Sequence, residues 1–193
     1  MDFREMNTKE LIPIITLFVL VIILSVLNPE FLTLYNIHSV FIQASVLLVL
    51  ATGITFIILT GGIDLSVGAL ISLSGVLIAI LLPHLGYFAF VVVVLCGSLA
   101  GLVNGLVITR GKVPSFIVTL GTSGIWLSMA YVLCDGKPIS LPSRLGIYRL
   151  WIVGKTFGIS NIILISLFIV LVFWYILNKT TFGKYIFSIG NGE

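Results

Sequence analysis

The chain has 193 residues, of which 59% are hydrophobic and only 9% are Asp, Glu, Lys or Arg. An ordinary soluble domain carries about 25% charged residues, so this chain has too few polar groups to cover a surface that faces water. Its mean hydropathy of +1.26 excludes a disordered protein. Its 10 basic and 7 acidic residues form no basic patch that would bind nucleic acid. Two cysteines, Cys96 and Cys134, make neither a disulfide framework nor a zinc site, and we predict no metal site and no cofactor. With these classes excluded, the composition indicates an integral membrane protein.

The positions of the charged residues predict how often the chain crosses the membrane. Crossing a bilayer core about 30 Å thick takes roughly 20 apolar helical residues, and charge-free runs of that length or more recur along the chain. The run 65–109 is too long for one helix, and the turn signal Pro83-His84-Leu85-Gly86 divides it. Strands of a barrel are a poor alternative because the runs do not alternate apolar and polar residues. We therefore predict an all-α polytopic membrane protein with about six spans: Leu11–Leu27, Ser39–Leu59, Leu65–Leu82, Tyr87–Thr109, Val113–Cys134 and Asn161–Leu177.

The basic residues favour an orientation with both ends of the chain in the cytoplasm. The first span is preceded by charged residues, as in a secretion signal, but NPEFLTLYN follows it without a small-residue cleavage site, so we expect a retained span. Arg110 and Lys112 flank two spans directly, whereas the first outer loop, 28–36, holds no Lys or Arg. In this orientation the cytoplasmic pieces hold Arg4, Lys9, Arg110, Lys112, Lys179 and Lys184, and the outer loop between the last two spans holds Lys137, Arg144, Arg149 and Lys155.

Two motif-like matches do not carry chemistry. Gly154-Lys155-Thr156 has the end of a phosphate-binding loop, but the glycine needed five residues earlier is Arg149, so we do not expect this chain to bind ATP. The stretch 121–124, GTSG, resembles the GxSG of rhomboid-type intramembrane proteases. A serine nucleophile needs a nearby base, and the sixth predicted span holds no histidine. We therefore interpret GTSG as small residues that let helices pack.

The strongest local signal is LTGGIDLSVG, residues 59–68, which holds Asp64, the sole acidic residue between positions 31 and 134. A carboxylate at membrane depth is costly, so such a residue is usually paired or functional. A milder interpretation is that Gly61-Gly62 ends one helix and Asp64 caps the next by accepting an unpaired backbone N–H. The dipole of that helix would also favour the negative charge.

Small and polar residues continue from Asp64 at helical spacing. Gly68, Ser72, Gly75 and Ala79 follow at intervals of three or four and predict one helix face. A helix that faces only lipid has no use for such a face. Two interpretations stay open: capping and packing, or a place on a translocation pathway.

The fifth and fourth spans carry similar features. Ser115, Thr119, Thr122 and Trp126 form a stripe that suits a route for a polar solute, because an aromatic face packs against C–H surfaces; hydrogen bonding between helices explains the hydroxyls equally well. Gly97, Gly101 and Gly105 make a double GxxxG, which we expect to let another helix approach closely. Asn104 beside them either joins helices or lines a passage. The pathway candidates are thus Asp64, Ser66, Ser72, Asn104, Thr119, Thr122 and Trp126, and the helix-packing candidates are Gly68, Gly75, Gly97, Gly101 and Gly105.

Three stretches carry a resemblance to a known family. They are ILTGGIDLSVGALISLSG (58–75), NGLVITRGKVPSFIVTLGTSGIW (104–126) and TTFGKYIFSIGNGE (180–193), and NPEFLTLYNI (28–37) adds to them. In wording, order and spacing the chain resembles the permease subunit of the ribose-type monosaccharide ABC importers of bacteria. The resemblance covers nearly the whole chain, and GGIDLSVG is its most specific part.

The resemblance implies an importer in the bacterial plasma membrane with several partners. These are a second permease copy, a cytoplasmic ATP-binding subunit that hydrolyses ATP, and an extracytoplasmic sugar-binding protein. The permease itself would be no enzyme and would offer a path that opens alternately to each side, driven by a partner that binds one conformation better. Phe182, Gly183, Lys184 and Tyr185 would open the cytoplasmic loop that couples to the ATPase.

Family members resemble chains of about 300 residues or more, with further spans after that loop. We therefore expect residues 1–193 to be one transmembrane permease domain, truncated in the coupling loop 180–193. The predicted function is the permease subunit of an ATP-driven monosaccharide importer. The alternatives are an ion-coupled carrier that uses Asp64, a non-transporting membrane scaffold and, with least support, an intramembrane protease.

Overall fold

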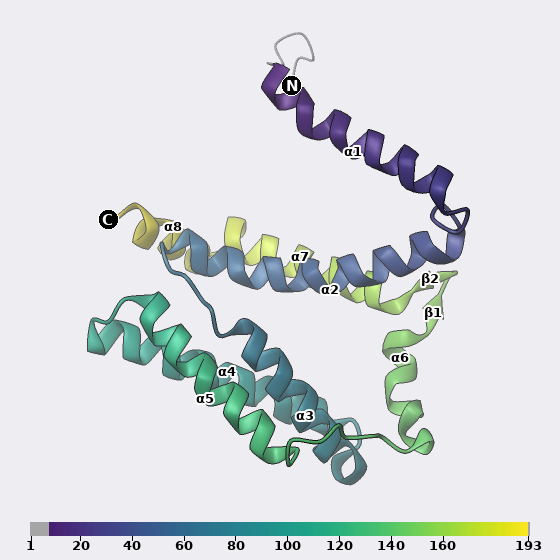
Figure 1. Ribbon diagram of the computed structural model, residues 1–193. Helices are drawn as coiled ribbons and strands as arrows, with labels where there is room; N and C mark the ends of the chain where they lie inside the picture. The colour runs from purple at the N-terminus through teal and green to yellow at the C-terminus, as the bar shows by residue number, and fades with distance from the viewer. Residues whose placement is uncertain (1–7, 193) are drawn as a thin grey trace. The chain divides into compact units, whose positions relative to one another are not determined.

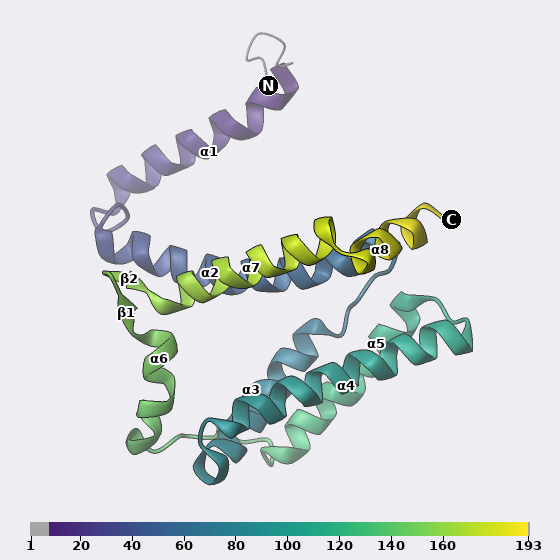
Figure 2. The same ribbon diagram turned by 180° about the vertical axis from the view of Figure 1, so that it is seen from behind.

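The computed structural model describes residues 8–192 as helices joined by short connections (Figure 1, Figure 2). Arg4 and Glu193, which entered the sequence analysis, lie outside the described residues. The chain divides into two compact units, residues 1–47 and 48–193. The first holds α1 (Thr8–Leu27) and the beginning of α2 (Leu34–Leu59).

The turn between α1 and α2 is stabilised by its own polar side chains. The Asn28 carboxamide oxygen accepts from the Glu30 N–H at 3.0 Å, and Asn36 donates to the Phe31 carbonyl at 2.7 Å. The Thr33 hydroxyl accepts from the Asn36 N–H at 3.3 Å and so satisfies a free donor in the first turn of α2. This explains why α2 begins at Leu34, ahead of the predicted Ser39.

The second unit contains the remaining long helices. They are the rest of α2, α3 (Val67–Leu85), α4 (Phe88–Gly111), α5 (Ser115–Leu133) and α7 (Asn161–Lys179), followed by the short α8 (Thr181–Asn191). Between α5 and α7 lie the 3-10 helix η1 (Ser143–Arg149), α6 (Leu150–Val153) and an antiparallel hairpin of β1 (Lys155–Thr156) and β2 (Ile159–Ser160), in which Lys155 pairs with Ser160.

Helices α3, α4 and α5 pack together as a bundle in both views (Figure 1, Figure 2). Its buried apolar residues are mostly small or medium in size: Ala69, Leu73 and Leu82 on α3, Ala89, Val93 and Ala100 on α4, and Val118 and Ala130 on α5. Helix α7 runs beside the later part of α2, where the Phe56 and Phe173 rings meet edge to face at 5.3 Å.

The lengths and composition of these helices confirm an all-α, multi-pass membrane protein. Five described helices, α2, α3, α4, α5 and α7, are long and apolar enough to cross a membrane, and the apolar part of α1, Leu11–Leu27, is shorter. Their large apolar side chains mostly point outward, Phe168, Leu171 and Val132 among them. In a bilayer that surface faces lipid, while the backbone polar groups are paired inside each helix.

Both boundaries of α3 differ from the prediction. Helix α3 begins at Val67 rather than Leu65, because the connector before it is held in a non-helical form. It also continues through Pro83 to Leu85, since a proline in the last turn removes only one hydrogen bond. The predicted break after this helix is confirmed at Gly86, whose φ of 53° suits a glycine and whose N–H donates to the Leu82 carbonyl at 3.0 Å. The stretch after Lys179, which we expected to be a loop, forms α8.

Candidate functional site

The site is built around the connector, residues 60–66, which joins α2 to α3. Helix α2 ends at Leu59, and Gly61 takes the left-handed conformation with φ of 75°. The Gly62 N–H then donates back to the Ile57 carbonyl at 3.0 Å, which closes the end of the helix. Beyond this turn the backbone is non-helical as far as the N-cap of α3.

Two hydroxyls of α5 hold the connector. The Ile63 N–H donates to the Ser115 hydroxyl at 2.9 Å, and the Leu65 N–H donates to the Thr119 hydroxyl at 3.1 Å. The Thr119 hydroxyl is also within donating distance of two carbonyls, that of Ile63 at 3.2 Å and that of Ser115 at 2.9 Å. Non-helical backbone at membrane depth is tolerated only where protein or a wet cavity satisfies it. These hydroxyls therefore pair with the connector's backbone, which neither interpretation of the stripe foresaw.

Asp64, Ser66 and Asn104 form a buried chain of hydrogen bonds. The Ser66 N–H and hydroxyl both donate to the Asp64 carboxylate, at 2.7 and 2.6 Å. The Asn104 amide nitrogen on α4 donates to the Ser66 hydroxyl oxygen at 3.1 Å. Ser66 is fully buried and Asn104 is 4% exposed. The chain thus joins the connector to α4.

This chain corrects the predicted capping role of Asp64. The N-cap residue of α3 is Ser66, and Asp64 stands two residues before it. Asp64 accepts the Ser66 N–H, which is the bond that the capping interpretation predicted, but it does so from two residues before the N-cap. The reason is that Gly62 and Ile63 still belong to the α2 exit and the α5 contact, so the helix starts later than the motif suggested.

The hydrogen-bond chain also fixes the orientation of the Asn104 amide. A serine hydroxyl has one hydrogen, and Ser66 gives it to Asp64, so Ser66 can only accept from Asn104. The Asn104 carboxamide oxygen is consequently directed away from Ser66, and it has no hydrogen-bond partner among the described residues. A buried acceptor without a partner is costly, and Asn104 also lines the cavity beside the connector.

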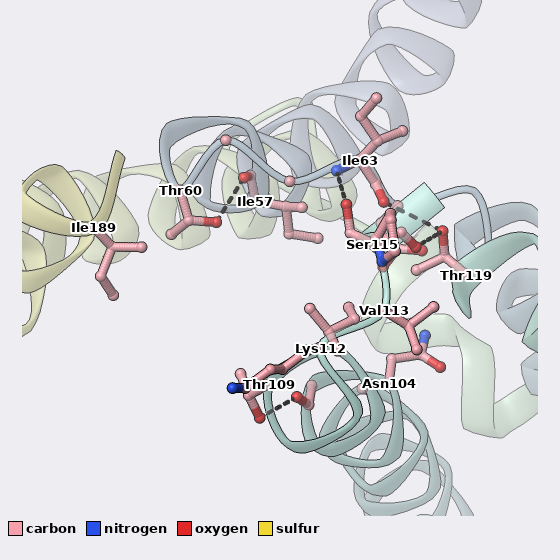
Figure 3. Close-up of a pocket in the computed structure, with 17 residues that line it drawn as sticks. Ile57, Thr60, Ile63, Asn104, Thr109, Lys112, Val113, Ser115, Thr119 and Ile189 are labelled. Atoms are coloured by element: carbon pink, nitrogen blue, oxygen red, sulfur yellow. Dashed lines mark hydrogen bonds between the residues drawn. The ribbon is translucent and has the colours of Figure 1, made fainter. Parts of the chain in front are cut away.

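A cavity of about 700 Å³ opens between the connector, α4, α5 and α8. Figure 3 shows Asn104 and Lys112 on one side, Ser115 and Thr119 on another, and Ile189 of α8 on a third. Lys112 ends α4 in the left-handed region with φ of 52°, a conformation that costs energy for a residue with a Cβ. The polar lining is formed by Thr60, Asp64, Asn104, Thr109, Lys112, Ser115 and Thr119, and the apolar lining includes Ile57, Ile63, Ile108 and Ile189.

The structure brings four of the seven predicted pathway residues together: Asp64, Ser66, Asn104 and Thr119. The other three lie elsewhere. Ser72 donates to the Gly68 carbonyl of its own helix at 3.2 Å and lines smaller hollows between α3 and α5. Thr122 donates to the Thr119 carbonyl at 3.3 Å. The buried indole N–H of Trp126 has no partner among the described residues.

The five glycines expected at helix contacts have open space around them. A Cβ added at Gly68, Gly75, Gly97, Gly101 or Gly105 meets nothing within 4 Å. Gly101 and Gly105 line the cavity. Close packing at these glycines therefore finds no partner within the described part of the chain and stays a prediction.

Helix α8 carries the four residues predicted to couple to an ATPase. The Thr180 hydroxyl accepts from the Gly183 N–H at 3.4 Å and so starts the helix. Gly183 is buried, and Phe182, Lys184 and Tyr185 are exposed. Sequence reasoning missed Ile189 as a lining residue, since only the fold of α8 places it at the cavity. It also missed that Ser115 accepts a hydrogen bond from the connector, although the position of Ser115 on the polar stripe of α5 was a signal for such a role.

The chain is similar to known permease proteins. A family model described as the permease component of the branched-chain amino acid transport system matches residues 36–193. The ribose import permease protein of Haemophilus influenzae is 37% identical over 183 residues, which are 93% of this chain and 57% of that protein. The ribose import permease protein of Bacillus subtilis is 38% identical over 189 residues, 96% of this chain and 58% of the relative.

A third relative is named for a different sugar, D-allose. The D-allose transport system permease protein of Escherichia coli is 33% identical over 187 residues, covering 92% of this chain and 56% of that protein. The chain therefore spans a little over half the length of the curated relatives it matches. No solved structure matches the chain significantly.

Proposed function

The chain belongs to the permease-component family whose model covers residues 36–193, and from that premise we propose that it is the permease subunit of an ATP-driven monosaccharide importer. It is a multi-pass protein of the bacterial plasma membrane. The observation that carries the proposal is the similarity, over more than nine-tenths of the chain, to permeases named for ribose and allose. ATP hydrolysis belongs to a partner subunit.

The cavity beside the connector is the part of the proposed pathway that this chain contributes. Its lining combines apolar side chains with a few hydrogen-bonding groups, a combination typical of sites for small polar ligands. The Asn104 oxygen lacks a partner among the described residues and is shielded from solvent in this conformation, and a sugar hydroxyl can donate to it once the wall of the cavity opens toward it. The Lys112 ammonium and the Ser115 and Thr119 hydroxyls supply further polar groups around the same space. A sugar must bind only weakly if it is to pass through the cavity. A small number of direct contacts keeps its binding weak.

Helix α8 provides the proposed contact with the ATP-binding subunit. Phe182 and Tyr185, three residues apart, are 58% and 68% exposed and lie on one outward face. Exposed aromatic residues on a short terminal helix favour a protein partner. A second permease copy and an extracytoplasmic sugar-binding protein complete the proposed importer, as expected of the permease family to which the chain belongs.

The experiment is uptake of labelled ribose and allose by vesicles that contain the purified transporter with its ATP-binding subunit and binding protein. We expect uptake that requires hydrolysable ATP and persists when a protonophore collapses the ion gradients. Uptake that follows the gradient and ignores ATP would favour an ion-coupled carrier, and a complex without any uptake would favour a scaffold.

A variant pair tests the ATPase contact in the same preparation. Tyr185→Ala is expected to lower copurification of the ATP-binding subunit at least fivefold, because it removes an exposed aromatic ring of α8. Tyr175→Ala removes an equally exposed ring from α7, within a membrane span, and serves as the control. Equal recovery of the subunit with both variants would contradict the role given to α8.

A further inference from the structure

Two glycines place the backbone of α8 directly against two membrane helices. A Cβ added at Gly183 would collide with the carbonyl group of Leu177 near the end of α7, and one added at Gly190 would collide with the carbonyl oxygen of Leu59, the last residue of α2. Among the other glycines inside the described helices, Gly53 of α2 and the five packing candidates named above have open space. At Gly183 and Gly190, therefore, the neighbouring backbone leaves no room for a side chain.

The two glycines share one face of α8. They are seven residues, or about two turns, apart, and Ile186 between them is 5% exposed. The neighbouring face, about 100° around the helix, repeats the same spacing with exposed aromatic and aliphatic residues, and its last member, Ile189, is 59% exposed and lines the cavity. Helix α8 therefore has an inner face that rests on α7 and α2 and an outer face of exposed apolar side chains.

The contact at Gly190 lies where the connector begins. Leu59 is followed at once by Thr60 and Gly61, and the connector is then held by Ser115, Thr119 and Asn104 through the hydrogen bonds described above. Because the glycine leaves backbone against backbone, no flexible side chain stands between α8 and the end of α2. Gly190 is exposed on its other sides, and a direct backbone contact passes a displacement on without first moving a side chain.

We propose that Gly190 is a positioning residue that links movement of α8 to the connector and so to the cavity. The inference rests on the proposed function, in which the outer face of α8 contacts the ATP-binding subunit. When that subunit shifts α8, the contact between Gly190 and Leu59 moves the end of α2, and the Gly61 turn lets the connector follow. Ile189 moves with α8 and changes the wall of the cavity at the same time.

The test measures sugar uptake and ATP hydrolysis on the same vesicles, with the complete transporter and its partners. Gly190→Ala puts a methyl group against the Leu59 carbonyl. We expect the number of sugars imported per ATP to fall at least fivefold, with hydrolysis kept within twofold of the wild type. Gly53→Ala adds the same methyl group to α2 in open space and should leave the ratio unchanged.

Amide hydrogen exchange on the wild-type complex gives a second readout that needs no variant. A non-hydrolysable ATP analogue is expected to change the exchange of residues 60–66 together with that of α8. An unchanged ratio in Gly190→Ala, or exchange that changes in α8 and not in 60–66, would overturn the inference. If Gly190→Ala does not assemble, the exchange result decides. Absence of ATP-dependent uptake in the wild type would instead overturn the proposed function.

Discussion

Ser66 joins two helices through one hydroxyl group. It donates to Asp64 in the connector and accepts from Asn104 on α4, and it is fully buried between them. Buried polar groups of this kind are stable only when each has a partner. The position of the connector against α4 therefore depends on the hydroxyl group of one side chain, Ser66.

Replacing this hydroxyl should destabilise the protein. Ser66→Ala leaves the Asn104 amide nitrogen without its acceptor and takes one donor from Asp64, and a buried group that loses its partner costs about 1–3 kcal/mol. We expect a lower midpoint of thermal unfolding for the purified protein in detergent, measured by its helical circular dichroism signal.

The matched control for this prediction is Ser72→Ala on the same helix. The Ser72 hydroxyl donates only to the Gly68 carbonyl one turn earlier, a bond whose loss leaves no other side chain unpaired. Its midpoint should stay close to that of the wild type. Equal effects of the two substitutions on the midpoint would contradict a special contribution of the hydrogen bond between Ser66 and Asn104 to stability.

At this scale the sequence indicated the right segment but not its bonds. Asp64 stood out because a lone carboxylate among apolar residues is rare, and the glycines before it signalled the turn. Ser66 and Asn104 are 38 positions apart, and their contact depends on how α3 packs on α4. The bond expected of Asp64 is present, but the N-cap residue is Ser66 because the α5 hydroxyls hold the connector in a non-helical form, and a local pattern contains no information about α5.

The GxxxG glycines of α4 face open space and not another described helix. The spacing of Gly97, Gly101 and Gly105 predicts a helix contact, yet each has open space on its Cβ side. Gly101 and Gly105 border the cavity beside Asn104. A larger side chain at Gly101 would therefore point into space that the proposed function assigns to the passing sugar.

Gly101→Leu is expected to reduce sugar uptake at least tenfold while the yield of folded, assembled transporter stays within twofold of the wild type. The leucine extends toward a cavity of about 700 Å³, and its Cβ meets nothing within 4 Å. Uptake into vesicles and size-exclusion chromatography in detergent measure the two quantities. Gly97→Leu, on the same face but away from the lining, is the control. Loss of assembly in both variants would instead support the helix contact predicted from the spacing.

The helices themselves were largely predictable, and their ends were not. Long apolar runs between charges predict spans because lipid offers backbone groups no alternative partner. Pro83 marked the right turn but the wrong boundary, since α3 accommodates it in the last turn and ends at Gly86. Helix α8 escaped prediction because its inner face depends on two glycines that pack against α7 and α2, and glycines lower helix propensity in a sequence.

At the scale of the whole molecule, the two ends of the second unit carry different groups of residues. At one end, Lys112 at the end of α4 lines the cavity together with Ile189 of α8, the helix that also carries Lys184. At the other end the loop before α7 packs its aromatic rings on the start of α4: Tyr87 meets Tyr148 at 4.9 Å and Phe90 meets Trp151 at 5.9 Å. Aromatic rings of this kind gather at membrane interfaces.

This arrangement leads to a test of the predicted orientation, in which the end with Lys112 and α8 faces the cytoplasm. Basic residues in short loops are retained on the cytoplasmic side, so we expect Ser140→Cys, in the loop after α5, to react with a membrane-impermeant maleimide in intact spheroplasts. Asn191→Cys, at the end of α8, should react only after the membrane is permeabilised. Both variants are made with Cys96→Ala and Cys134→Ala, since the two native thiols are free, and the variant without any cysteine measures background labelling. Reaction of Asn191→Cys in intact spheroplasts would invert the topology, and α8 would then lie on the side of the membrane where no ATP-binding subunit can reach it.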